Sequence, residues 1–109
     1  MTKWNYTFLP EAIDDLKRLD GSVRKRVLKA LDKVAENPLP QSDPHNPGYG
    51  VPLGNKWNKD LTGLMKVKLR KDGVRIVYHL VKTETSFEII VIGMREDEAV
   101  YREAFLRKK

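Results

Sequence analysis

Hydrophobic and polar positions follow two different periods in the first third of the chain. Large and polar side chains alternate over residues 4–8, which predicts a short strand. Apolar residues then recur at helical spacing over residues 10–19 and again over residues 22–35. Asp20-Gly21 separates the two runs, so we expect the two helices to form a tight antiparallel hairpin.

The second half of the chain carries three strand patterns and one helix pattern. Residues 64–70 and 74–81 alternate, and residues 87–94 are almost wholly apolar, as expected for a central strand. Residues 96–106 begin with acids and are followed by bases, which suits the dipole of a last helix. The expected order is β-α-α-β-β-β-α. This is an α+β domain whose helical hairpin packs on a small, mostly antiparallel four-stranded sheet, with a C-terminal helix.

Between the hairpin of helices and these strands the composition changes. Residues 38–60 hold five prolines and three glycines and little apolar material, which predicts a long irregular loop within a single domain of residues 1–109. Loops of this length are usually functional or mobile. The alternative is a connection that only returns the chain to the sheet.

Composition and charge narrow the class of protein. The 109 residues suffice for one modest core. The N-terminal ten residues lack the apolar run of a signal peptide, and the longest apolar stretch, residues 89–92, is too short to span a membrane. The absence of cysteine excludes a disulfide scaffold and fits the cytoplasm. A net charge of +6 favours a nucleic acid or an acidic protein as partner.

Asp72-Gly73 is a strong signal for a two-residue turn between the strands at 64–70 and 74–81. With Lys71 facing Val74, the expected cross-strand pairs are Arg70 with Arg75, Lys68 with Val77, and Lys66 with His79. Seven core-like side chains then share one face: Met65, Val67, Leu69, Val74, Ile76, Tyr78 and Leu80.

The other face of this hairpin gathers basic side chains. They are Lys66, Lys68, Arg70, Arg75 and His79. The only acid between residues 64 and 81 is Asp72, in the turn. Like charges directly across a strand pair destabilise it by roughly 0.2–1 kcal/mol per pair, so stability alone would favour a different composition. Two interpretations remain: a solvated face, or a surface that binds phosphates.

A cationic face can also assist the cleavage of RNA. Attack of a 2′-hydroxyl on the adjacent phosphate creates a phosphorane with extra negative charge, and fixed cations stabilise that transition state more than the ground state. A lysine crowded by other cations gives up its proton more readily and can act as a general base. This chemistry needs no metal or other cofactor. His45 and His79 stand alone, without the spacing of a metal site.

Several short segments, in their joint order and spacing, make the chain resemble the RelE/ParE superfamily of toxins from type II toxin–antitoxin systems. They are Leu-Thr-Gly at 61–63, Lys-Val-Lys-Leu-Arg at 66–70, Gly-Val-Arg-Ile-Val-Tyr at 73–78, and Ile-Gly-Met-Arg-Glu at 92–96 followed by Val100-Tyr101. The resemblance covers nearly the whole chain. It implies a metal-independent, ribosome-dependent endoribonuclease that cuts mRNA in the ribosomal A site and is restrained by a cognate antitoxin.

The resemblance also implies roles for individual residues. Lys66 and Lys68 match lysines that bind the scissile phosphate, and Lys68 is the candidate general base. Arg75 matches the arginine that stabilises the transition-state charge. Arg95 matches an arginine proposed to assist the departing 5′-oxygen. Tyr101 matches the tyrosine that orients or stacks on the mRNA near the cut.

Arg70 and His79, on the same face, are further candidates for RNA binding.

Each of these site residues also has a simpler structural interpretation. Tyr101 lies on an apolar helical stripe that is typical of a core, and Arg95 would simply neutralise a nearby glutamate. A histidine in a sheet is more often only hydrogen-bonded. The bases of the second helix are expected to be a solvated face, with ribosomal RNA contact as the alternative: Arg24, Lys25, Arg26, Lys29 and Lys33.

Two rival functions share these features. A ParE-like toxin of the same fold would poison DNA gyrase and cleave no RNA, although such toxins generally lack the set of lysines and arginines found here. A non-catalytic RNA-binding module would use the same basic face without any chemistry.

Overall fold

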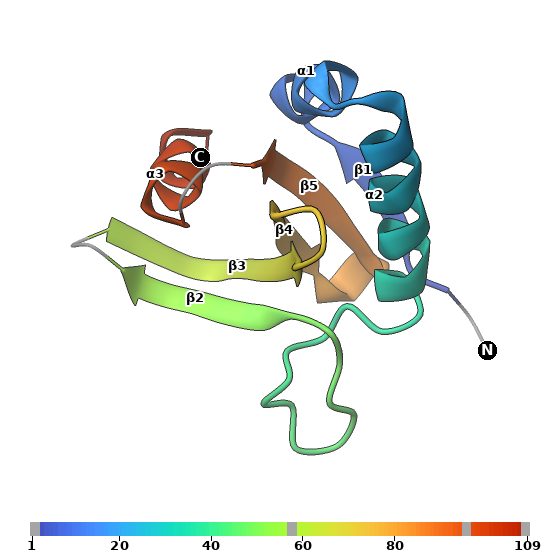
Figure 1. The fold of residues 1–109 in the computed structure, drawn as a ribbon. Coiled ribbons are helices and arrows are strands. Elements are labelled where there is room, and N and C mark those ends of the chain that lie inside the picture. Colours follow the sequence, from blue (N-terminus) through green and yellow to red (C-terminus); the bar gives the residue numbers. More distant parts are fainter. Residues whose placement is uncertain (1–2, 57–58, 95–96, 108–109) are drawn as a thin grey trace.

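The computed structural model describes residues 3–56, 59–94 and 97–107. Its strands form one five-stranded sheet in the order β1-β5-β4-β3-β2 (Figure 1). The elements are β1 (Asn5–Phe8), α1 (Pro10–Arg18), α2 (Gly21–Val34), β2 (Val51–Lys56), β3 (Lys59–Leu69), β4 (Val74–Val81), the 3-10 turn η1 (Lys82–Glu84), β5 (Ser86–Gly93) and α3 (Asp97–Arg107). β1 pairs with β5 in parallel and the other pairs are antiparallel, which confirms the predicted α+β class.

The prediction of a continuous loop over residues 38–60 is wrong, because this segment contains strand β2. β2 pairs with β3, which starts at Lys59 rather than at residue 64, so the sheet has five strands and not four. The register of this pair shifts between Pro52 and Gly54. β2 is an edge strand, and edges tolerate proline because their outward N–H groups need no partner. The proline and glycine hide the alternation from the sequence pattern.

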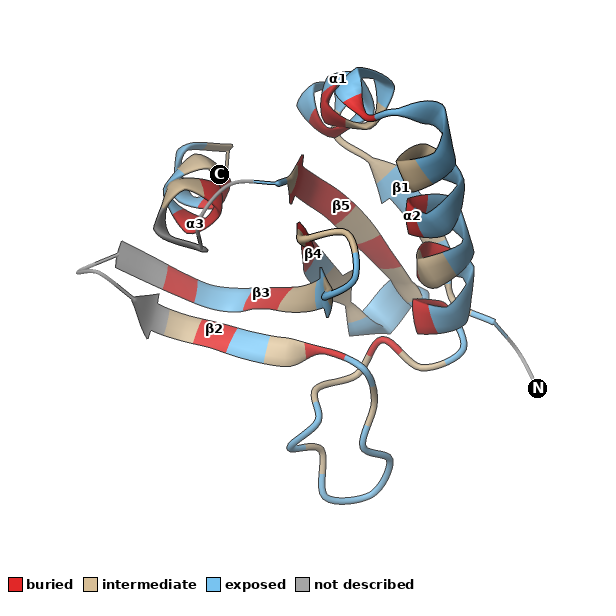
Figure 2. Ribbon diagram, viewed as in Figure 1, coloured by how far each residue is buried: buried red, intermediate tan, exposed pale blue. Residues whose placement is uncertain are grey.

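The sheet is covered on both faces, by α1 and α2 on one and by α3 on the other (Figure 1). Val27 and Leu31 of α2 belong to one core cluster, together with Ile76 of β4. Val100 of α3 belongs to a second cluster, with Val77 on the opposite face of β4. Figure 2 shows buried residues on the sides of α2 and α3 that face the sheet. None of the described helices is long and apolar enough to cross a membrane.

The hairpin of β3 and β4 keeps its predicted faces but not its predicted register. The observed cross-strand pairs are Leu64 with His79, Lys66 with Val77, Lys68 with Arg75, and Leu69 with Val74. The connection is four residues long, 70–73, and Gly73 has φ of 71°. A longer turn closed by a glycine in the left-handed region displaces the pairing by two residues. Because that displacement is even, every side chain stays on its expected face.

Candidate functional site

A hollow of about 280 Å³ lies at the end of the β3–β4 hairpin and brings three of the predicted site residues together. Its lining consists of Lys68, Leu69, Arg70, Gly73, Val74 and Arg75. Lys68 and Arg70 are exposed, whereas Arg75 is half-buried. The Nη1 of Arg75 donates to the carbonyl oxygen of Gly73 at 2.8 Å. This bond holds the guanidinium against the backbone of the turn.

The hollow is electrostatically one-sided. Lys68 lies directly opposite Arg75, an arrangement that costs stability, and among the described residues that line the hollow none is acidic. The nearby Asp72 is engaged elsewhere, since its two carboxylate oxygens accept hydrogen bonds from Nε and Nη2 of Arg26 at 2.8 and 2.7 Å. The bond to Arg26 lowers the pKa of Asp72. The cluster is therefore suited to an anion.

Lys66 lies beside the hollow on the same strand and contacts the predicted tyrosine. It is half-buried, and its Nζ is 5.5 Å from the centroid of the Tyr101 ring, within the range of a cation–π contact. Tyr101 itself is only 1% exposed and belongs to the core under α3. The structure thus places Tyr101 in the core, as the plainer interpretation has it, and its role toward RNA stays a prediction.

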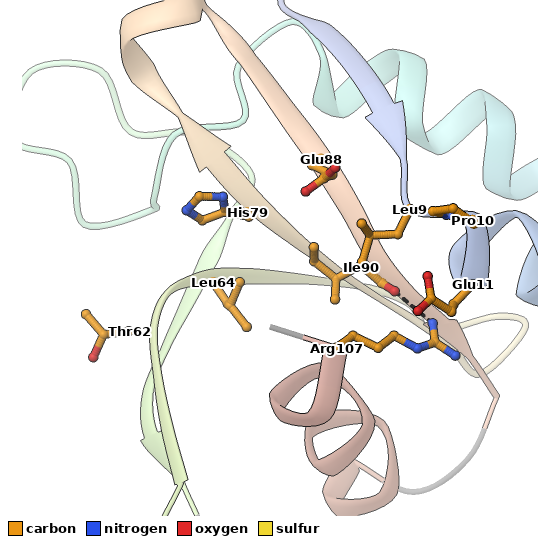
Figure 3. A pocket seen from close by; sticks show the side chains of 9 residues that line it. All are labelled: Leu9, Pro10, Glu11, Thr62, Leu64, His79, Glu88, Ile90 and Arg107. Atoms are coloured by element: carbon orange, nitrogen blue, oxygen red, sulfur yellow. Dashed lines mark hydrogen bonds between the residues drawn. The ribbon is translucent and has the colours of Figure 1, made fainter. Parts of the chain in front are cut away.

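His79 does not face Lys66 as predicted, because the register puts it opposite Leu64. It lines a separate pocket of about 370 Å³, shown in Figure 3 with all of its residues: Leu9, Pro10, Glu11, Thr62, Leu64, His79, Glu88, Ile90 and Arg107. Two acids, Glu11 and Glu88, stand in its wall. No group of three or more metal-ligating side chains occurs within the described parts of the chain. Binding of RNA by His79 stays a prediction.

Arg95 lies outside the described residues. The last residue of β5, Gly93, is the cross-strand partner of Arg75. A side chain at Gly93 would meet a methyl group of Val100, since an added Cβ would lie 2.9 Å from it. The glycine therefore allows α3 to pack closely where β5 ends beside the cationic hollow.

Comparison with known proteins identifies the family behind this geometry. Residues 6–99 match a family model described as the ParE toxin of the type II toxin–antitoxin system parDE. The chain belongs to this family of the RelE/ParE superfamily. It is also 30% identical over 100 residues to the mRNA interferase toxin RelE of Escherichia coli K12, a match that covers 92% of each chain.

Solved structures agree with this membership. A variant of the E. coli toxin RelE with two arginines changed to alanine, in the free state, is similar with a TM-score of 0.74 and 25% identity, and the match covers 99% of this chain and 100% of that one. The toxin in the intact E. coli RelBE toxin–antitoxin complex gives a TM-score of 0.64 at 25% identity, over 85% and 98% of the chains. The chain is a RelE-like toxin of a toxin–antitoxin system.

An ion pair that sequence reasoning missed fastens α3 to the rest of the fold. Asp15 of α1 is buried, and its Oδ2 accepts hydrogen bonds from Nη1 of Arg107 at 2.7 Å and from the backbone N–H of Ile92 at 3.1 Å. The same Nη1 donates to the carbonyl oxygen of Ile90 at 2.8 Å. β1 pairs with β5 up to Ile89, so these two side chains serve backbone groups of β5 beyond the end of β1.

The basic face of α2 divides into two groups. Arg24 donates to three carbonyl oxygens at the end of α1, those of Leu16, Lys17 and Leu19. Arg26 binds Asp72, so two of the five predicted surface bases hold elements together. The three lysines Lys25, Lys29 and Lys33 are exposed, as a solvated face requires. Neither arginine contact has a local signal in the sequence, because the partners lie on other elements.

Proposed function

We propose that this chain is a ribosome-dependent endoribonuclease that cuts mRNA in the A site by metal-free attack of the 2′-hydroxyl. The single observation that supports this most is the hollow in which Lys68, Arg70 and Arg75 converge without an acid among its described lining residues. The similarity to a relative named as an mRNA interferase supports the choice of substrate. Such a role places the chain in the cytoplasm, where ribosomes work.

The proposed reaction uses the hollow as an anion site for the scissile phosphate. The 2′-oxygen forms a bond to phosphorus as the bond from phosphorus to the 5′-oxygen breaks, which yields a 2′,3′-cyclic phosphate and a 5′-hydroxyl. Lys68 takes the proton of the 2′-hydroxyl, and Arg75 donates hydrogen bonds to the phosphorane oxygens. A proton returns to the departing 5′-oxygen, a role that the resemblance assigns to Arg95.

Lys66 and Tyr101 form a second layer in this proposal. The Tyr101 ring lies beneath Lys66 Nζ, and this contact would hold the lysine next to the phosphate site. The hollow is small and lies at the tip of a hairpin. It can bind one phosphate, but it offers no long groove that would align a flexible RNA strand. The ribosome supplies the missing alignment by holding the codon in a reactive pose.

The decisive experiment is a cleavage assay on a defined mRNA with and without programmed bacterial ribosomes. We expect cuts inside the A-site codon only when ribosomes are present, and a loss of about 10²–10³-fold in the cleavage rate for Arg75→Ala, as for other groups that stabilise a transition-state oxyanion. Lys82→Ala, an exposed change in η1 that removes an equal charge, is the matched control and should cleave normally. Equal cleavage by wild type and Arg75→Ala would remove the assignment of the site.

The ParE-like alternative rests on the description of the matching family model. A supercoiling assay with purified DNA gyrase tests it. Inhibition of gyrase together with intact A-site mRNA would favour that alternative over the nuclease. Binding of mRNA on ribosomes without any cut would instead favour the non-catalytic module.

We further propose that a cognate antitoxin binds the chain, because a solved relative is a toxin–antitoxin complex. Co-expression of the chain with the product of the adjacent gene, followed by sedimentation, tests the association. Co-sedimentation that abolishes cleavage is expected. Failure of the two proteins to associate would count against this partner.

A further inference from the structure

The pocket drawn in Figure 3 is acidic, although the chain as a whole is basic. Two of its lining residues, Glu11 and Glu88, are acids, in a chain whose net charge is +6. We infer that this pocket binds a basic side chain, an arginine or a lysine, of the cognate antitoxin. This inference rests on the proposed function, in which an antitoxin binds the chain.

The negative charge of the pocket is not balanced by its own wall. Among the described lining residues the one arginine or lysine is Arg107. Its guanidinium donates two hydrogen bonds to Asp15, at 2.7 and 3.3 Å, and one to Glu103 at 2.9 Å. The carboxylates of Glu11 and Glu88 make no ion pair or hydrogen bond with any residue that the structure describes. The pocket therefore keeps an excess of negative charge.

Glu88 is the acid whose position needs an explanation. Glu11 lies in the first turn of α1, where an acid stabilises the helix through its dipole. Glu88 instead is half-buried on β5, between Thr7 of β1 and His79 of β4. A half-buried carboxylate that has no cation beside it among the described residues costs stability. A basic group from a partner protein would offset that cost.

The rest of the lining favours a long basic side chain over a small cation. Leu64 and Ile90 are buried and Leu9 is half-buried, so part of the wall is apolar. Lysine and arginine have apolar stems that pack on such a surface while the charged end reaches a carboxylate. The volume of about 370 Å³ is at the small end of ligand pockets and is enough for one such side chain. Pro10 and His79 are exposed, so the pocket opens to solvent.

The two carboxylates also argue for a protein and against RNA, because they repel phosphates. The position of the pocket fits an antitoxin. His79 shares a face of the hairpin with Lys68 and Arg75 of the hollow. It follows Arg75 by four positions on β4, which is about 13 Å along a strand. A protein anchored in the pocket is therefore close enough to the hollow to block the access of mRNA.

The test measures the affinity of the product of the adjacent gene for the wild-type chain and for Glu88→Gln by isothermal titration calorimetry. We expect Glu88→Gln to raise the Kd at least about tenfold, because a charge pair that is desolvated in the complex is lost. Glu84→Gln, which removes an equal charge at an exposed position of η1 outside the pocket, is the control and should bind like wild type.

Replacing each lysine and arginine of the antitoxin by alanine, one at a time, identifies the occupant. One of these changes should weaken binding to the wild-type chain about tenfold and have little further effect on binding to Glu88→Gln, as expected for two groups in contact. Normal binding by Glu88→Gln, or the absence of any base that couples to it, would overturn the inference.

Two further measurements separate binding of the antitoxin from other roles of Glu88. Urea unfolding should show Glu88→Gln to be at least as stable as wild type, since the change removes a half-buried charge. A clear loss of stability would indicate a structural role and contradict the inference. Cleavage on programmed ribosomes should be unchanged in Glu88→Gln. A different rate or codon preference would assign the pocket to mRNA instead.

The proposed partner and the pocket can fail separately. If the wild-type chain does not bind the product of the adjacent gene, the proposed antitoxin and this inference are both wrong. If the wild-type chain binds it and Glu88→Gln binds equally well, only the assignment of the pocket is wrong.

Discussion

The hydroxyl of Tyr78 lies where the loop of residues 38–50 meets the sheet. It is buried and donates a hydrogen bond of 2.6 Å to the carbonyl oxygen of Pro38. Burial raises the pKa of this hydroxyl, so it remains a donor at any physiological pH. An added Cβ at Gly50 would clash with the hydroxyl oxygen of Tyr78, so the loop needs a glycine here to pack against the tyrosine. One residue thus sets how the loop meets β4.

At this residue scale we predict that Tyr78→Phe destabilises the fold by about 1–3 kcal/mol, because the buried carbonyl of Pro38 loses its donor. Urea unfolding followed by circular dichroism measures the change. Tyr6→Phe is the control, since the hydroxyl of Tyr6 donates to Asp32 in an exposed contact at 2.9 Å and its loss should cost less. Equal losses in the two variants would contradict the role given to burial.

The individual site residues were predictable to different degrees. The alternation of the hairpin was enough to place Lys68 and Arg75 on one face, because a side-chain period of two survives an even change of register. The same reasoning misplaced His79 by two positions, since it assumed a two-residue turn at Asp72-Gly73 and the connection is four residues long. Burial of Tyr101 followed from its helical stripe, whereas its contact with Lys66 did not.

At the scale of elements, two side chains satisfy the backbone groups of β5 beyond the point where its pairing with β1 ends. Asp15 and Arg107 supply an acceptor to Ile92 and a donor to Ile90, much as a neighbouring strand would do. Burial alone would lower the pKa of Arg107, but the bonds to Asp15 and Glu103 more than offset this and raise it. The arginine therefore stays charged and ties α3 to α1 and to the sheet.

We predict that Arg107→Ala destabilises the chain by about 3 kcal/mol, because it leaves the carboxylate of Asp15 buried without its closest cation. The chain provides its own control. Arg18 contacts the same carboxylate at 3.5 Å but is 75% exposed, so Arg18→Ala should cost less than about 1 kcal/mol. Urea unfolding measures both, and an equal loss in the two variants would show that the buried pair has no special role.

A second contact between elements gives a pH dependence. Burial, followed by the hydrogen bond to Asp32, raises the pKa of Tyr6 from 10.0 to about 12 and links β1 to α2. A raised pKa in the folded state means that stability from this group is complete below pH 10 and is lost as pH rises toward 12. Chemical unfolding at pH 9 and pH 11.5 should show a larger loss for wild type than for Tyr6→Phe. A parallel decline of both proteins would contradict this assignment.

The elements themselves were predictable where their period was clean. Both helices of the hairpin, β4 and β5 followed their patterns to within a residue or two. β2 could not be predicted, because an edge strand is fixed by its partner β3 rather than by its own alternation. The ion pair of Asp15 with Arg107 joins residues 92 positions apart, and only the packed fold brings them together.

At the scale of the whole molecule, the charge is distributed over two surfaces with different consequences. The net charge of +6 includes the exposed lysines of α2, on the face of the sheet opposite to the hollow. Exposed charges act over a distance and attract an RNA-rich particle, but salt screens them within about 8–10 Å. In the proposed function, the cations of the hollow act at contact distance on one phosphate, where screening is weaker.

This division predicts that salt affects the rate of association with ribosomes more than the rate of the cleavage step. Raising the salt concentration from about 50 to 200 mM should slow association with programmed ribosomes at least tenfold, because several phosphate contacts release counterions. The single-turnover cleavage rate of complexes already formed should change less than about twofold.

Lys25→Glu combined with Lys29→Glu should slow association and leave that cleavage rate intact, whereas Arg75→Ala should slow cleavage and leave association intact. Stopped-flow binding and quenched cleavage on the same ribosomes distinguish these effects. If salt or the α2 variant slows the cleavage step as strongly as the binding step, the two surfaces act as one, and the hollow cannot be an independent site.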